Sequence, residues 1–243
     1  ALSPRGLWRQ TSSTWGRGDM LQELLDEHFF AGLRYGNLPR RRPMVLINAT
    51  DMRYGDRFEF SQDQFDQLCS DLDQLPLARA VAASMAVPIV LSPITLWNHG
   101  DHCPTTVEAP LARRRSASSR YVHLVDGGLA DNTGIRAPIE LVTARGGLMR
   151  TTELAGMHHV NRHVIIIVNA QVDPYDASDD SPNTPGLLRQ LRSAVDVPID
   201  RQSATNMQAL AQSVLQWRQE ASDAAGTPAD IHVIEISVAS SRN

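Results

Sequence analysis

The 243-residue sequence has no long apolar run and no long basic tract. Without roughly 20 consecutive apolar residues, no helix is expected to span a membrane. The net charge is -4 and the pI is near 6.1, with basic residues scattered along the chain. Nucleic acid is therefore not expected as a partner, because proteins that bind it usually carry a concentrated positive surface. The hydrophobic content of 42% is enough to build a globular core.

Cysteine is scarce and no metal-binding motif is present. Cys69 and Cys103 are too few for a disulfide framework. The sequence does not decide whether they are two buried thiols or form one disulfide bridge. His159 and His163 are four residues apart but lie where a loop enters a predicted strand, so one helical face does not present both. The acidic segment 173–180 lacks the spacing of a calcium loop. We expect no metal and no other cofactor.

Apolar runs of strand length alternate with segments of helical spacing. The predicted strands are Met44–Thr50, Arg57–Phe60, Tyr121–Val125, Arg162–Ala170 and Ile231–Val238. The predicted helices are Met20–Phe30, Ser61–Leu72, Leu77–Val87, Ile135–Ala144, Leu187–Val195 and Gln202–Ala221. This alternation predicts an α/β fold with a mostly parallel sheet. With no internal repeat and no linker, we expect a single domain over residues 1–243.

Asp126 directly follows the predicted strand Tyr121–Val125, where reactive groups of α/β proteins gather. Gly127 and Gly128 come next and permit a tight turn and close backbone approach. Taken alone, Asp-Gly is more often an ordinary turn. No histidine completes a triad, because strand alternation places His123 and Asp126 on opposite faces. A nucleotide site is disfavoured, since no glycine-rich phosphate loop follows any predicted strand.

The surroundings of Asp126 resemble the patatin-like phospholipase family. The resemblance is found in three segments: Val45-Leu-Ile-Asn-Ala-Thr-Asp51, the small-residue run Arg79–Ile89 with Ser92-Pro93, and Leu124-Val-Asp126-Gly-Gly-Leu-Ala-Asp-Asn132. Their order and spacing match over roughly residues 44–140. The resemblance implies a three-layer α/β/α sandwich and a Ser-Asp dyad that hydrolyses acyl esters of lipids. On that basis Asp126 is the general base, and Gly127 and Gly128 adjoin the site.

The sequence departs from the family at the nucleophile. It contains neither Gly-x-Ser-x-Gly, which presents the serine on a sharp turn, nor a glycine-rich oxyanion loop. Because the sequence opens without Met, we expect the N-terminal part of the domain, with both elements, to lie upstream of Ala1. Ser84 lacks flanking glycines and is expected to be structural. The alternative is a non-catalytic member of the fold that binds lipid or protein.

The resemblance also bears on substrate, surface and compartment. It implies a lipid or other acyl ester as substrate, and the arginines at 40–42 and 113–115 are candidates for contact with a membrane surface, although solvated loop charges are commoner. Similar proteins are expected at the bacterial cell envelope or secreted, with the cytoplasm as the alternative. On that basis we expect Cys69 and Cys103 to be disulfide-bonded, with Cα atoms within about 7 Å.

Overall fold

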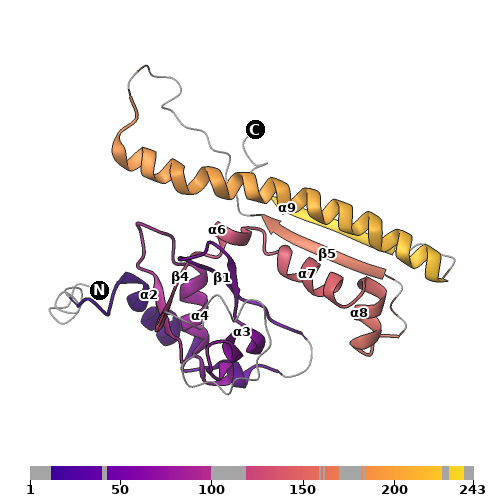
Figure 1. The fold of residues 1–243 in the computed structure, drawn as a ribbon, viewed down its shortest axis with the longest axis horizontal. Coiled ribbons are helices and arrows are strands. Elements are labelled where there is room, and N and C mark those ends of the chain that lie inside the picture. Colours follow the sequence, from indigo (N-terminus) through magenta and orange to yellow (C-terminus); the bar gives the residue numbers. More distant parts are fainter. Residues whose placement is uncertain are drawn as a thin grey trace. The chain divides into compact units, whose positions relative to one another are not determined.

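The computed structural model describes residues 12–39, 43–99, 119–158, 160, 162–169, 182, 184–225 and 230–237. The chain forms two compact units, residues 1–130 and 131–243. Figure 1 shows the elements of both. The expectation of one domain over the whole chain stays a prediction.

The first unit combines short helices with a four-stranded sheet. Its elements are α2 (Arg17–Leu25), the π-helical turn η1 (Asp26–Phe30), η2 (Tyr35–Asn37), β1 (Asn48–Asp51), β2 (Arg57–Glu59), α3 (Gln62–Asp66), η3 (Leu72–Gln74), α4 (Leu77–Ser84), β3 (Ile94–Trp97) and β4 (Tyr121–Val125). The short helix α6 (Gly128–Asp131) begins at the end of this unit. The strand order is β2-β1-β4-β3. An α/β organisation is thus present.

A mostly parallel sheet is not what the described strands form. Within the four-stranded sheet every pair is antiparallel, with Asn48 opposite Glu59, Thr50 opposite Val125 and Ile94 opposite Leu124. The connection from β1 to β2 is too short for a parallel crossover, which requires a dozen or more residues. Gly55 in this connection has a φ of 70°, the left-handed conformation that glycine adopts without strain. The four-stranded sheet is thus antiparallel, and the predicted mostly parallel sheet is not confirmed.

One face of this sheet carries the core of the first unit. Val122 and Leu124 of β4 point into it, whereas Tyr121 and His123 are exposed, as strand alternation requires. Phe58 and Phe60 are fully buried and meet edge to face with ring centroids 5.3 Å apart. The small side chains of α4 let this helix pack closely against the sheet, and Ala80, Ala82 and Ala83 are completely buried.

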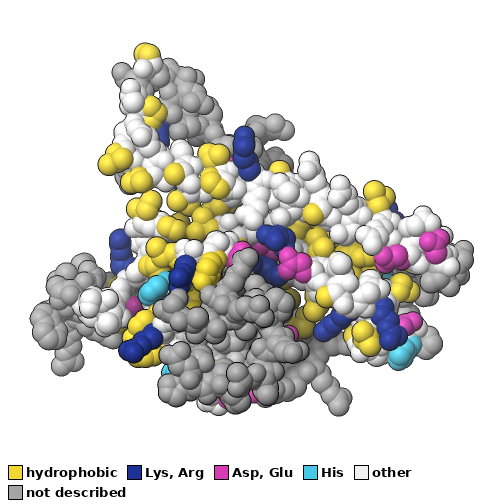
Figure 2. Space-filling model, in the orientation of Figure 1, with side chains coloured by type: hydrophobic (Ala, Val, Ile, Leu, Met, Phe, Trp, Pro, Cys, Tyr) yellow, Lys and Arg dark blue, Asp and Glu magenta, His cyan; other side chains and the backbone are white. Residues whose placement is uncertain are grey.

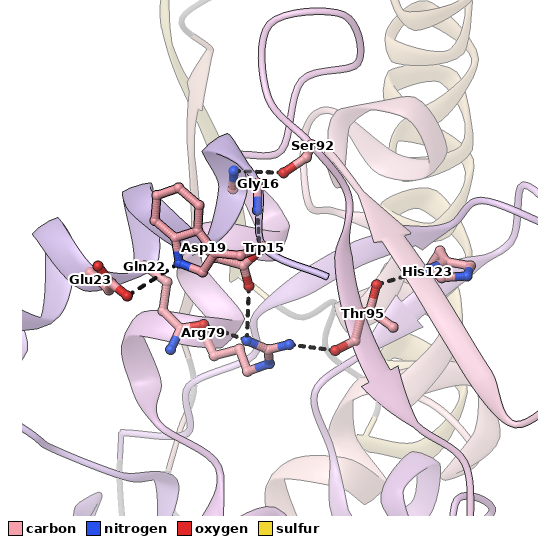
Figure 3. A network of polar contacts seen from close by, with 10 residues as sticks. Trp15, Gly16, Asp19, Gln22, Glu23, Arg79, Ser92, Thr95 and His123 are labelled. Atoms are coloured by element: carbon pink, nitrogen blue, oxygen red, sulfur yellow. Dashed lines mark hydrogen bonds and ion pairs between the residues drawn. The ribbon is translucent and has the colours of Figure 1, made fainter. Parts of the chain in front are cut away.

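A polar network anchors α2 to the rest of the first unit (Figure 3). Arg79 of α4 lies 3.5 Å from Asp19 and donates to Gln22, both on α2, and also to the main-chain oxygen of Thr95 in β3. Ser92 accepts a hydrogen bond from the Gly18 amide at 2.8 Å. The N-terminal end of α2 is therefore fixed to the segment between α4 and β3.

The second unit contains α7 (Arg136–Ala144), α8 (Leu148–Leu154), β5 (Arg162–Asn169), α9 (Leu187–Ala225) and β6 (Asp230–Ser237). β5 and β6 pair in parallel along their whole length. Ile167 and Ile231 join the helices in a second core around Trp217. The apolar side chains on the opposite face of the pair stay exposed, namely Val164, Ile166, Val168, Ile234 and Ile236. A third layer over this pair, as a three-layer sandwich requires, is not seen among the described residues.

The helix α9 corrects the prediction of two separate helical stretches. It runs unbroken for 39 residues and contains Pro198, which lacks the amide hydrogen of a regular helix. Burial of Leu210, Val214 and Trp217 beyond the proline explains why tertiary packing overrides this break signal. Figure 2 shows hydrophobic side chains at the surface of the first part of α9, where Leu187 is 73% exposed. Along the described residues no helix combines the length and hydropathy of a membrane span.

Candidate active site

Asp126 lies immediately after β4, as predicted from the sequence. Its main-chain amide donates to the carbonyl oxygen of Ala86 at 2.9 Å, and the amide of Gly127 donates to that of Ser84 at 3.2 Å. The Thr50 hydroxyl in β1 donates to the Asp126 carbonyl oxygen at 2.7 Å. The Asp126–Gly127 turn is therefore held from two sides, by the end of α4 and by β1.

The Asp126 carboxylate is partly buried and accepts one hydrogen bond from the residues that the structure describes. Its Oδ1 accepts from the Gly128 amide at 2.7 Å. Burial raises the pKa of Asp126 above the ordinary aspartate value, and the Gly128 hydrogen bond opposes this rise. A carboxylate with a raised pKa is a stronger proton acceptor than an ordinary aspartate, which suits a general base.

Glycine is required at position 127 by close packing. A Cβ atom there would stand 2.5 Å from the main-chain oxygen of Asn48 in β1 and 3.5 Å from the Ser84 hydroxyl. No real side chain tolerates the first distance without a backbone shift. The Gly-Gly pair after Asp126 thus lets the turn press against β1, which agrees with the close approach predicted from the sequence.

A buried acceptor lies next to this turn. Asn48 and Thr50 alternate with Ala49, which is fully buried in the core, so both side chains lie on the opposite face of β1. Thr50 uses this position to reach Asp126. The Asn48 Oδ1 atom is buried, and within the described part of the chain no donor reaches it. An unsatisfied buried acceptor is uncommon and calls for an explanation.

The residues that end the motif belong to the second unit and are tied to α9. Asp131 is 4% exposed, and its two carboxylate oxygens accept from the Asn206 side chain at 3.0 Å and from the Arg136 amide at 3.0 Å. Asn132 donates to the hydroxyl of Ser203 at 3.1 Å. These hydrogen bonds join the motif to residues of α9 that lie 71 and 75 positions further along the chain. No local sequence pattern predicts them.

Other candidates are not brought together with Asp126. His123 is exposed and its Nδ1 lies 2.9 Å from the Thr95 hydroxyl. A pocket of about 450 Å³ lies in the first unit at the other end of β4, with Tyr121 and His123 in its lining and Asp126 outside it. Whether the Asp126 carboxylate faces an open cleft stays a prediction. Ser84, at the end of α4, is close to Gly127 but lies on no strand-to-helix turn.

Several residues predicted from the sequence to form a disulfide, contact a membrane or bind a metal lie outside the described residues. Cys69 is disulfide-bonded, and its predicted partner, Cys103, lies outside the described residues. The arginines at 40–42 and 113–115, His159 and the whole acidic segment 173–180 also lie outside them. Among the residues that are described, no three His, Cys, Asp or Glu side chains form a group able to hold a metal.

Comparison with known proteins gives one family. A sequence profile described as Patatin-like phospholipase matches residues 2–139, more than half of the chain. The matched region contains Asp126, the β1 residues that support it and α4. It ends within α7, so α8, β5, α9 and β6 lie beyond it. No curated protein and no solved structure matches the chain significantly.

Proposed function

The chain belongs to the patatin-like phospholipase family, and from this we propose that it is part of a lipid acyl hydrolase in which Asp126 acts as general base. Family membership suggests acyl ester hydrolysis. The observation that carries the assignment to Asp126 is its position directly after β4, in a turn clamped by α4 and β1, with a carboxylate whose pKa is raised by burial.

In the proposed reaction a serine hydroxyl attacks the ester carbonyl while Asp126 accepts its proton. The proton then passes to the leaving alcohol, and water hydrolyses the resulting acyl-enzyme with Asp126 again as base. No histidine is needed between the two residues. Gly127 and Gly128 keep the turn compact, and the Gly128 amide orients one carboxylate oxygen so that the other can face the serine.

We propose that the serine and the oxyanion donors come from a polypeptide segment outside these 243 residues, because no Gly-x-Ser-x-Gly motif occurs in the sequence. The buried Asn48 Oδ1 beside the turn supports this, since an additional segment packed there could supply the missing donor. Labelling with a fluorophosphonate is the test. The isolated chain should stay unlabelled, whereas a natural protein that contains both this chain and the motif should be labelled at the motif serine. Labelling at Ser84 would overturn the proposal.

A second function, a non-catalytic lipid- or protein-binding module of the same fold, is favoured by one observation only, the absence of the nucleophile motif. It predicts no labelling of any protein that contains this chain.

We further propose a location at the cell envelope or outside the cell rather than in the cytoplasm. The disulfide at Cys69 supports this, because structural disulfides persist in oxidising compartments. Protein extracted from its source with an alkylating agent present should bind the agent at neither cysteine until it is reduced. Alkylation at both without reductant would contradict the proposal.

A further inference from the structure

The loop between α4 and β3 exposes apolar side chains beside Asp126. Met85 is 46% exposed, Val87 39%, Ile89 50% and Val90 60%. We call these four residues the lip. Met85 and Val87 flank Ala86, whose carbonyl oxygen accepts the hydrogen bond from the Asp126 amide. Two of the lip residues are therefore the chain neighbours of Ala86, which contacts Asp126 at 2.9 Å.

The main chain of this loop is fixed even though its side chains point outward. The Asp126 amide holds it at Ala86, and the Gly18 amide holds it at Ser92. Figure 3 shows Ser92 at the start of α2. Between these points Arg17 donates to the carbonyl oxygen of Ile89 at 3.3 Å, and the Leu91 amide donates to that of Val87 at 2.9 Å. A loop anchored in this way does not need its exposed apolar side chains for its own stability.

Ile89 combines an exposed apolar side chain with an unfavourable backbone conformation. Its φ of 74° lies in the left-handed region, which is unfavourable for any residue with a Cβ and most of all for a β-branched one. Such strain is usually compensated by burial or linked to function. Since half of Ile89 is exposed, burial within the described structure compensates little.

We propose that the lip inserts into the surface of a lipid aggregate and thereby places Asp126 at the lipid–water boundary. The inference rests on the proposed function, because it takes lipid as the substrate class. Exposed apolar side chains next to a cation are the combination that binds such surfaces, and the exposed Arg17 supplies the cation for anionic headgroups. The lip residues do not line the pocket of about 450 Å³ that contains Tyr121 and His123.

The test is sedimentation of the whole natural protein that contains this chain with vesicles of phosphatidylcholine and phosphatidylglycerol in a three-to-one ratio. Wild type should sediment with the vesicles. Ile89→Asn keeps a residue that tolerates the left-handed backbone but removes the apolar side chain. It and Val90→Asn should each weaken binding by about fivefold, because each removes roughly half of a buried aliphatic side chain from the lipid. The matched control is Leu154→Asn on α8, where the side chain is 58% exposed and binding should not change.

Charge is tested separately at Arg17. Arg17→Gln should weaken binding to the anionic vesicles by about fivefold and leave binding to pure phosphatidylcholine unchanged, whereas Arg17→Lys should restore it. Circular dichroism verifies that each variant is folded. Absence of wild-type binding, or equal binding by wild type and both lip variants, would overturn the inference. The sedimentation experiment measures vesicle binding and not turnover. A negative result would therefore reject the lip as a lipid-binding surface without testing Asp126 as the general base.

Discussion

The Thr50 hydroxyl donates a 2.7 Å hydrogen bond to the main-chain carbonyl of Asp126, 76 residues further along the chain. Thr50 is 3% exposed, so water cannot replace this donor if it is lost. The contact connects the segment 45–51 with the Asp126 motif, two of the three segments that carry the family resemblance.

Replacing Thr50 by Val, which has nearly the same shape, should therefore destabilise the chain by about 1–2 kcal/mol. Thr50→Ser retains the hydroxyl and should restore the hydrogen bond at the smaller cost of a lost methyl group. Urea unfolding measures both. A Val variant as stable as wild type would mean that this hydrogen bond does not hold the turn.

Gly127→Ala tests the close approach of the turn to β1. The added methyl would stand 2.5 Å from the Asn48 carbonyl oxygen, so we expect a loss of about 2 kcal/mol or more in the free energy of unfolding. Gly186→Ala is the matched control, because its Cβ would meet nothing within 4 Å. It should change stability by less than about 0.5 kcal/mol. Equal effects of the two changes would contradict the packing seen at Gly127.

Asn206→Ala tests the attachment of Asp131 to α9. It removes the donor to a buried carboxylate and should cost about 1–3 kcal/mol. Asn206→Asp should be worse at neutral pH, because it places two carboxylates within hydrogen-bonding distance, and should recover as the pH falls. Thermal unfolding followed by circular dichroism at pH 5 and pH 7 makes this comparison. If Asn206→Asp were as stable as wild type at pH 7, the hydrogen bond between Asn206 and Asp131 would not contribute to the stability of the second unit.

Asp126 itself should carry a stability cost at neutral pH. Its pKa is raised by burial, so in the folded state the carboxylate binds its proton more tightly than in the unfolded chain. As the pH rises from the ordinary aspartate pKa, about 3.9, through the raised value, the folded state loses stability relative to the unfolded one. Asp126→Asn keeps an acceptor for Gly128 without this cost. The variant should be more stable than wild type at pH 7, and the difference should vanish as the pH falls below the ordinary value. Wild type more stable at pH 7 would contradict the burial effect.

Local sequence patterns were sufficient for the elements nearest the site. The strand Tyr121–Val125 ends where its apolar alternation ends, Asp126 follows it, and the helix predicted from Ile135 begins at Arg136. The apolar run from Met44 was only partly a strand, because its first residues are exposed and β1 begins at Asn48. β3 was missed, since Ile94–Trp97 is short and follows Pro93.

What the sequence could not reveal are relations between distant residues. Antiparallel pairing depends on which strands become neighbours, and neither Thr50 nor Leu124 encodes its partner locally. The attachment of Asp131 to Asn206, and of Asn132 to Ser203, joins a short motif to a helix beyond the family match. Ile89 gives no sign in the sequence of its left-handed backbone, because residues of this kind rarely adopt it.

The most direct test of the account is the rate of ester hydrolysis by a natural protein that contains this chain and a Gly-x-Ser-x-Gly motif, compared between wild type and Asp126→Asn. Asp126→Asn should lower kcat by at least about a hundredfold, because the amide keeps the shape of the side chain but cannot accept the serine proton. Unchanged fluorescence and circular dichroism spectra would show that the fold is intact. Hydrolysis by Asp126→Asn at the wild-type rate would contradict the assignment of Asp126 as the base.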